Sequence, residues 1–579
     1  MVYHCLLRGG IILVMERLRA ELQQIVKRLF GVEIEVELTV PPAEMQADYA
    51  TNVALKLAKV AHRSPLEIAE QIKSELIVAM PELGVEVARP GFLNCRFSDE
   101  YFRGQVQQGL EQGINISSDE YIDKVVVSEF SDPNPFKVLH VGHFYTSVVG
   151  DAISHLLEFA GAKVYRTNFG GDVGLHVGKT LWAVQQRKYS PDDITVDRLG
   201  ECYVEGTGAY EENEAAKTEI TEINKTVYQI AALGETESVA QYGDLAALYW
   251  RGRQLSYEYF ADFYAQIGLQ FDKYYPESGV AGRGLAEVKA HLGTTYEESN
   301  GAIVYKGEKV GLHTRVFVNQ TGVPTYEAKD VGLLFTKWDD YHFDESVVIT
   351  GNEIIDYMKV VLASVHEYAP ELVERTTHLT HGMVRLQGNV KMSSRKGNFL
   401  KAVDVLELIR EAMRTEHGKT DEKVVLAAVK YAFLKYKIGG DIIFDPQESV
   451  ATNGNSGVYL LYSAVRAQKI LQKLENSAKD ELNKKFVQEQ TEVEKTRERI
   501  LNKKIVQYAE VLSEAVREMA PYKVCNYLYE LAQEFSRFYE HVPVVGNPRA
   551  DELAVTIRAY YRVMEHGLGL LGIEIPEEM

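Results

Sequence analysis

The chain has 579 residues, 46% hydrophobic and 25% charged, so its length predicts roughly three or four globular domains and its composition excludes a disordered or fibrous protein. Its formal net charge of −20 argues against a generally basic surface for non-specific nucleic-acid binding, although it leaves room for a local basic groove. The cysteines at positions 5, 95, 202 and 525 form no CxxC pair, which indicates neither a disulfide framework nor a zinc knuckle. We therefore expect a cytoplasmic protein, and the apolar stretch at residues 11–15 is too short to span a membrane.

The first part of the chain predicts a small α+β domain over residues 15–118. MERLRAELQQIVKRLF, starting at Met15, has the apolar spacing of an amphipathic helix. VEIEVELTV (residues 32–40) alternates apolar and acidic residues as a strand does, and RPGFLNCRF (residues 89–97) predicts another strand.

The middle of the chain predicts an α/β domain over residues 119–450. Residues 125–130, VVVSEF, are typical of a buried parallel strand; a helix ending at Gly161 and the strand KVYRTNF follow. Between about 181 and 300 the pattern changes to long helices, which we interpret as an insertion. Strands return at residues 313–319 and 346–350.

The last part of the chain, residues 451–579, predicts a helical bundle, because almost every window after about residue 455 has helical periodicity. Residues 484–504 carry many charges of both signs. Such a stretch is typical of a solvated helix face.

Residues 133–144, PNPFKVLHVGHF, place His140 and His143 where a strand passes into a helix. A helix N-terminus after the first parallel strand favours phosphate, because its N–H groups and its dipole attract anions. Imidazoles can donate to phosphate oxygens, and Gly142 leaves room for a flat ring or a ribose. A metal pair or two surface histidines are the alternatives, but no Asp, Glu or Cys has a spacing that completes a metal site.

A second segment, VKMSSRKGN (residues 390–398), is a basic loop that also contains serines and a glycine. Taken singly, such a loop is more often simply solvated. In this order, on either side of an α/β domain with an insertion, HVGH and KMSSRKGN resemble the two signatures of class I aminoacyl-tRNA synthetases. The resemblance implies a Rossmann-like catalytic domain in which both segments bind ATP. Preorganised donors would stabilise the phosphate charge that develops as the amino acid is activated.

Other segments are similar to arginyl-tRNA synthetases in particular. They are EFSDPNPFKVLHVGH, the N-terminal phrase ADYATNVAL, the helix SGVYLLYSAVRAQKIL and the ending GLGLLGIEIPEEM. The resemblance implies an arginine–tRNA ligase that uses L-arginine, ATP with Mg²⁺ and tRNA(Arg), without a bound structural metal and as a monomer. Another class I synthetase and a non-catalytic tRNA-binding paralogue are the alternatives.

A guanidinium ion is planar and carries five donors, so its pocket needs carboxylates for fork-like pairing and an aromatic or amide group to fix its plane. Tyr326 and Asp330 are four residues apart and should share one helix face. The residues that the resemblance implies for arginine are Glu129, Ser131, Asn134, Tyr326 and Asp330. Without the resemblance, each carboxylate reads more simply as an ordinary loop or surface charge.

The same resemblance implies the groups that bind ATP: Lys137, His140, Gly142, His143, Lys391, Met392 and Ser393. Of these, His140, His143, Lys137 and Lys391 are the expected catalytic residues. Ser394 replaces the second lysine of the family's KMSKS loop, and Lys137 is expected to supply a cation in its place. Two further departures are Ile354 and Tyr357, where the family more often has glutamine and histidine.

In the C-terminal helices, Tyr459, Tyr462 and Arg466 follow helical spacing in VYLLYSAVR. Tyrosines can stack on unpaired bases and arginine can contact phosphate. A tyrosine stripe is nonetheless more often core than interface. The likeness to anticodon-binding helices favours the interpretation that these residues contact tRNA.

Overall fold

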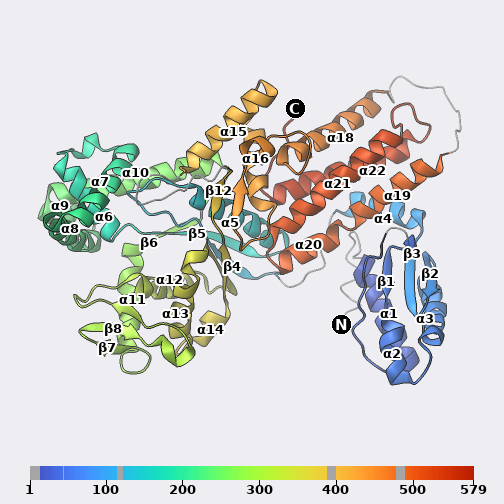
Figure 1. Ribbon diagram of the computed structural model, residues 1–579, viewed down its shortest axis with the longest axis horizontal. Helices are drawn as coiled ribbons and strands as arrows, with labels where there is room; N and C mark the ends of the chain where they lie inside the picture. The colour runs from blue at the N-terminus through green and yellow to red at the C-terminus, as the bar shows by residue number, and fades with distance from the viewer. Residues whose placement is uncertain (1–13, 43–44, 114–120, 388–399, 478–489) are drawn as a thin grey trace.

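The computed structural model of the chain describes residues 14–42, 45–113, 121–387, 400–477 and 490–579. Figure 1 shows an elongated molecule: a small N-terminal unit lies beneath the C-terminal helices at one end, and a helical lobe forms the other end. A parallel sheet lies between the two ends.

The N-terminal unit packs helices on a three-stranded antiparallel sheet of order β1-β3-β2. Its first helix buries Leu18, Leu22 and Ile25 on one face, as the amphipathic pattern predicted. Its elements are α1 (Val14–Phe30), β1 (Tyr49–Thr51), α2 (Val53–Ala61), α3 (Pro65–Ala79), β2 (Leu83–Ala88) and β3 (Phe92–Phe97), and α4 (Asp99–Gln112) leads out of it.

The strand predicted for residues 32–40 is wrong. Within this stretch only Thr39 forms a ladder contact, an isolated bridge to Ala50. The alternation still has a physical basis, because Val36 is buried while the glutamates on either side of it are exposed. Its carbonyl accepts a hydrogen bond from Nε of Arg19 in α1 at 3.2 Å. This part of the segment is therefore held against α1 rather than paired in a sheet.

The central sheet has the order β11-β10-β4-β5-β6, and all neighbouring strands are parallel. Its strands are β4 (Val125–Glu129), β5 (Lys163–Gly170), β6 (Lys273–Pro276), β10 (Glu345–Gly351) and β11 (Thr376–His381). The chain winds outward from β4 in one direction and then from β10 in the other. A doubly wound sheet of this kind opens a crevice at the carboxyl ends of the two strands where the order reverses, here β4 and β10. The predicted α/β, Rossmann-like fold is confirmed.

The connections of this sheet position the crevice. Between β4 and β6 lie α5 (Val141–Phe159), α6 (Leu175–Gln186), α7 (Val196–Glu212), α8 (Glu214–Leu233), α9 (Glu235–Tyr242) and α10 (Asp244–Gln266). Next come α11 (Glu277–Ala290), a small antiparallel sheet of β7 (Glu297–Ser299), β8 (Ala302–Tyr305) and β9 (Arg315–Val318), α12 (Tyr326–Tyr341), α13 (Ile355–His366) and α14 (Pro370–Glu374). The stretch interpreted as an insertion is helical as far as Gln266, after which β6 adds a strand to the main sheet.

In the described residues after β11, the chain is helical apart from one short parallel pair of strands. Its elements are β12 (Val384–Leu386), α15 (Ala402–His417), α16 (Glu422–Leu434), β13 (Ile442–Phe444), α17 (Pro446–Ser449), α18 (Gly457–Ser477), α19 (Glu492–Val506), α20 (Tyr508–Arg517), α21 (Pro521–His541) and α22 (Ala550–Leu570). The predicted all-helical C-terminal part is confirmed.

Charged side chains join the N-terminal unit to these last helices. Asp48, 2% exposed, accepts hydrogen bonds from both terminal nitrogens of Arg499 in α19 at 3.2 and 2.9 Å, and Nζ of Lys503 lies 3.0 Å from it. Glu510 in α20 accepts from the backbone N–H of Met15 at 2.7 Å. The predicted solvated face is present in α19 at Glu492 and Lys495, which are exposed, but the same helix also forms an interface through Arg499 and Lys503.

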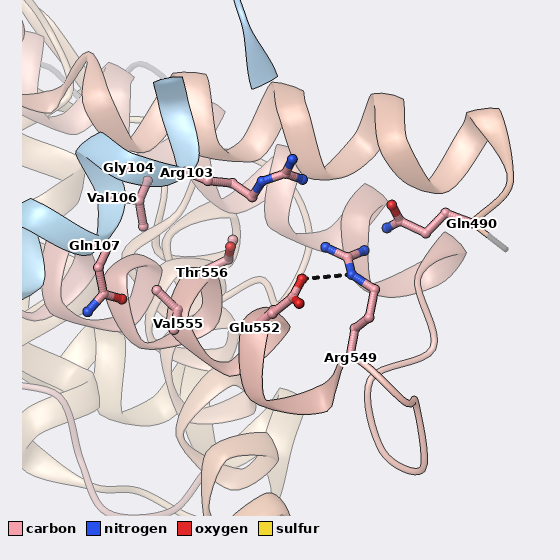
Figure 2. Close-up of a pocket in the computed structure, with 9 residues that line it drawn as sticks. All are labelled: Arg103, Gly104, Val106, Gln107, Gln490, Arg549, Glu552, Val555 and Thr556. Atoms are coloured by element: carbon pink, nitrogen blue, oxygen red, sulfur yellow. Dashed lines mark hydrogen bonds and ion pairs between the residues drawn. The ribbon is translucent and has the colours of Figure 1, made fainter. Parts of the chain in front are cut away.

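A cleft of about 600 Å³ opens beside this interface, between α4 and α22 (Figure 2). Arg103 and Arg549 line it, and both contact Glu498 in α19, at 3.3 Å for Arg103 and 3.1 Å for Arg549. Arg549 also donates to Glu552 at 2.8 Å. Because Glu498 pairs with both arginines, ion pairs within the protein stabilise this wall of the cleft.

Candidate active site

The loop from β4 to α5 places the HVGH residues at the mouth of the crevice. Three of its non-glycine residues, Ser131, Asp132 and Phe136, have φ between +48° and +75°. Left-handed backbone at such residues costs free energy and clusters at functional sites. The loop delivers His140 to the N-cap of α5 and His143 to its first turn.

The two histidines form a reciprocal cap. Gly142 N–H donates to His140 Nδ1 at 3.1 Å, and His140 N–H donates to His143 Nδ1 at 3.2 Å. Since both Nδ1 atoms accept, each neutral ring carries its proton on Nε2. Burial, reinforced by the nearby Lys137 charge, lowers the pKa of His140 to about 4, and burial also holds the pKa of His143 well below its ordinary value. Both rings are therefore neutral donors at neutral pH.

Close approach explains the glycine between the histidines. A Cβ on Gly142 would lie 2.9 Å from Cε1 and Nδ1 of His140. Any side chain here would push the His140 ring out of its cap, and the two imidazoles, now stacked with centroids 3.7 Å apart, would separate. Lys137 precedes them on the same loop, with Nζ 4.5 Å from the ring centroid of Tyr203 in α7.

Several carboxylates lie around the crevice, and most of them form an ion pair with a lysine or arginine side chain. Glu129, at the end of β4, pairs with Lys337 of α12 at 2.5 Å. Glu277, at the start of α11, pairs with Lys329 at 2.6 Å, and Glu327 pairs with Arg315 at 3.2 Å. The members of the first two pairs are almost fully buried. These pairs are internal to the protein.

Two further carboxylates, Asp132 and Asp330, have no ion-pair partner among the described residues. Asp132 accepts a hydrogen bond from Phe169 N–H at 2.8 Å, and Asp330 accepts one from the Tyr357 hydroxyl. Burial, together with the Glu129 charge, raises the pKa of Asp132 well above its ordinary value. Burial also raises the pKa of Asp330 to about 8, against the opposing Tyr357 hydrogen bond. A buried carboxylate without a cation can gain free energy when a cationic group binds beside it.

The other residues expected to bind arginine lie around the same crevice. Ser131 is 4% exposed, and its hydroxyl lies 2.8 Å from that of Tyr264. Asn134 Oδ1 accepts from Gly171 N–H at 3.2 Å, after the end of β5. Tyr326 is 53% exposed at the start of α12, and its ring lies 4.8 Å from Lys329 Nζ. Their roles in binding stay predictions, and so does that of Glu129, whose Oε2 is already paired.

The predicted tRNA-binding residues of α18 differ in exposure. Tyr462 is 41% exposed, accepts from a terminal nitrogen of Arg466 at 3.0 Å and lies under its guanidinium. The ring centroid of Tyr539 in α21 lies 5.6 Å from the central carbon of the same guanidinium. Lys469 and Lys473 line a shallow groove together with these residues. Tyr459 is only partly exposed and packs against Tyr529. Tyr462 and Arg466 thus present a ring and a charge to solvent, whereas Tyr459 faces mainly its neighbours.

Comparison with known families accounts for most of the chain. The family described as "Arginyl tRNA synthetase N terminal domain" matches residues 16–97, and "tRNA synthetases class I (R), catalytic domain" matches residues 105–445. The chain belongs to the class I arginyl-tRNA synthetase family. Residues 460–579 match a third family, "DALR anticodon binding domain".

Relatives of this arginyl-tRNA synthetase family member match it over nearly its whole length. The arginine–tRNA ligase of Porphyromonas gingivalis is 28% identical, over 98% of this chain and 100% of the relative. That of Treponema pallidum is 27% identical, over 93% and 94%. The solved arginyl-tRNA synthetases of Thermus thermophilus (TM-score 0.75, 22% identity, 98% of this chain and 100% of that one) and Plasmodium falciparum (TM-score 0.76, 19% identity, 99% and 100%) share the fold.

Sequence reasoning missed two residues of the crevice, Asp132 and Lys337. Asp132 lies between Ser131 and Asn134, which were predicted, but an aspartate in a loop does not by itself indicate a binding site. Lys337 lies seven residues after Asp330, hence on the same side of α12, and that spacing could have revealed it. Lys391, Met392 and Ser393, together with Ser394, lie outside the described residues.

Two searches of the described residues found nothing. No group of three or more His, Cys, Asp or Glu side chains is arranged there to hold a metal ion. Nor does any helix in the described part of the chain combine the length and apolar character required to cross a membrane.

Proposed function

We propose that the protein is an arginine–tRNA ligase. It activates L-arginine with ATP to arginyl-adenylate, releasing pyrophosphate, and then transfers arginine to the 3′ end of tRNA(Arg), releasing AMP. The observation that carries the proposal is the juxtaposition of two carboxylates without a cation, Asp132 and Asp330, with a histidine-capped helix N-terminus. A site that takes a guanidinium ion and a phosphate group side by side matches the two small substrates of this reaction.

The geometry of the described residues supports the roles proposed for them. The Nε2–H groups of His140 and His143 donate to phosphate oxygens, and Gly142 keeps both rings in place. Because both rings are neutral, they stabilise the phosphate charge that grows in the transition state without binding the ground state as strong cations. Lys137 supplies a cation from the same loop. Lys391, Met392 and Ser393 are proposed to cover ATP from the other side.

Arginine is proposed to bind with its guanidinium on Asp330, and Ser131, Asn134 and Tyr326 complete the pocket. Glu129 contributes through its remaining carboxylate oxygen and the field it places on Asp132 and Asp330. The arginine carboxylate then attacks the α-phosphate of ATP, which is used as its Mg²⁺ complex. Proximity and orientation at the switch point of the sheet carry much of the rate enhancement.

For tRNA, we propose that residues 451–579 bind the anticodon arm, with Tyr462 as a stacking platform and Arg466 on phosphate. Tyr459 supports that surface from behind. Residues 15–118 are proposed as a second tRNA-contacting domain and residues 119–450 as the catalytic domain. The protein is proposed to act as a monomer in the cytoplasm.

The test is aminoacylation of total tRNA with each of the twenty amino acids in turn. We expect charging with arginine alone. Charging with another amino acid would identify a different class I specificity. Binding of tRNA without charging by any amino acid would instead support the non-catalytic paralogue.

A further inference from the structure

Tyr357, on the first turn of α13, contacts the carboxylate expected to bind arginine. Its hydroxyl donates to Oδ2 of Asp330, one turn into α12. The ring packs under the guanidinium of Arg315, whose central carbon lies 5.3 Å from the ring centroid. Arg315 in turn pairs with Glu327 at 3.2 Å. Tyr357 is thus held on one side by a cation and holds Asp330 on the other.

A tyrosine at this position does something that a lysine or an arginine would not. A neutral donor fixes the orientation of a carboxylate but leaves its charge uncompensated. The neighbouring carboxylates Glu129, Glu277 and Glu327 each have a cation, whereas Asp330 has none among the described residues. Its hydrogen bond to Tyr357 therefore prepares the carboxylate for a cation that comes from outside the protein.

We propose that Tyr357 is a positioning residue that orients Asp330 for the guanidinium group of arginine. This inference rests on the proposed function, because it names how that same pocket selects its substrate. Ile354, one turn earlier, has an aliphatic side chain and can donate no hydrogen bond. In this chain the neutral donor beside Asp330 is the Tyr357 hydroxyl.

The test compares Tyr357→Phe with the wild-type full-length protein. The phenylalanine ring keeps the contact with Arg315 and removes only the hydroxyl. A hydrogen bond to a charged group is worth enough for its loss to weaken binding by roughly 10- to 100-fold. We expect calorimetry with L-arginine to show that loss, and arginylation to show a matching rise in KM for arginine. At saturating arginine, kcat should stay within about threefold of wild type, because the ATP-binding residues are untouched.

Two further variants separate positioning from packing. Tyr305→Phe is the matched control, since Tyr305 likewise donates its hydroxyl to a carboxylate of the α13 region, Glu367 at 3.0 Å, and is buried where Tyr357 is half-buried. It should bind arginine like the wild type. Tyr357→His keeps a ring with a donor and should regain part of the affinity that Tyr357→Phe loses.

Each outcome decides between the two roles. Unchanged arginine affinity in Tyr357→Phe would overturn the inference, and so would an equal loss in Tyr305→Phe, which would indicate general loosening around α13. If the wild type charges tRNA with arginine, these results bear on Tyr357 alone. If the wild type neither binds arginine nor charges tRNA, the proposed function fails and the inference fails with it.

Discussion

Replacing Asp48 tests whether the N-terminal unit is held on the C-terminal helices by buried charge. Burial raises the pKa of the Asp48 carboxyl, but hydrogen bonds and charge from Arg499 and Lys503 outweigh that effect and leave the pKa below its ordinary value. The ionised carboxylate therefore stabilises the docked form above the ordinary aspartate pKa, and the stabilisation is lost as pH falls through the lowered one. Asp48→Asn removes the charge, keeps the shape and retains an acceptor for Phe97 N–H, now at 2.9 Å.

The free-energy cost of Asp48→Asn depends on the partners that Arg499 retains. Breaking a buried ion pair by removing one partner costs about 3–5 kcal/mol. Arg499 retains Asp99 at 2.8 Å and the Phe97 carbonyl at 3.0 Å, so we expect the lower part of that range or slightly less, about 2–3 kcal/mol. That free energy raises the undocked population roughly 30- to 150-fold.

Hydrogen–deuterium exchange measures this directly. Amides of α19 and of β1 should exchange faster in Asp48→Asn, while those of the central sheet should not change. The control is Asp339→Asn, which removes the same charge from a half-exposed pair with Arg283 and should cost under about 1 kcal/mol. If exchange in α19 stays at the wild-type rate, the charges do not hold the two parts together.

Three further predictions concern single residues. His143→Ala should lower kcat by about 10²–10³-fold, as expected for loss of one donor to a developing oxyanion, with arginine affinity unchanged in calorimetry; an unaltered single-turnover rate would exclude the role. Arginine binding at pH 7 should release close to one proton, because Asp330, with a pKa of about 8, is mostly protonated before the guanidinium binds. Calorimetry in two buffers of different ionisation enthalpy measures the number of protons released. A value of zero would contradict the assignment of Asp330 to the guanidinium. Burial raises the pKa of Glu510 from 4.5 to about 7, so between these pH values the folded protein holds a proton that the unfolded chain releases. The free energy of unfolding should therefore fall as pH rises from about 4.5 to 7. Thermal unfolding of Glu510→Gln should show a smaller fall over this range, and a pH profile identical to that of the wild type would refute the prediction.

Local patterns predicted the elements whose burial shows in their own residues. The helix from Met15, buried on one face, and the strand at residues 125–130, buried on both, belong to this class. Residues 32–40 show the limit of the method, because alternation reports burial of Val36 but cannot tell whether another strand is present to pair with it.

The candidate site shows the same limit at the level of charge. Sequence reasoning placed Glu129 and Asp330 together, and the structure brings both to the crevice. The sequence could not show that Lys337, 208 residues from Glu129 along the chain, would pair with Glu129. Nor could it show that Asp132 would have no cationic partner among the described residues. Pairing of buried charges depends on side chains that meet only in the folded protein.

The charged interface between the N-terminal unit and α19 also has a consequence for synthesis. Asp48 and Arg499 are 451 residues apart, so at about 5–20 residues per second the ribosome needs roughly 20–90 s to deliver the second after the first. During that time the docking surface of the N-terminal unit is exposed to water. A carboxylate such as Asp48 stays hydrated, whereas an apolar surface of the same extent would attract other nascent chains. The ion pairs of this interface are therefore suited to a contact between an early and a late part of a long chain.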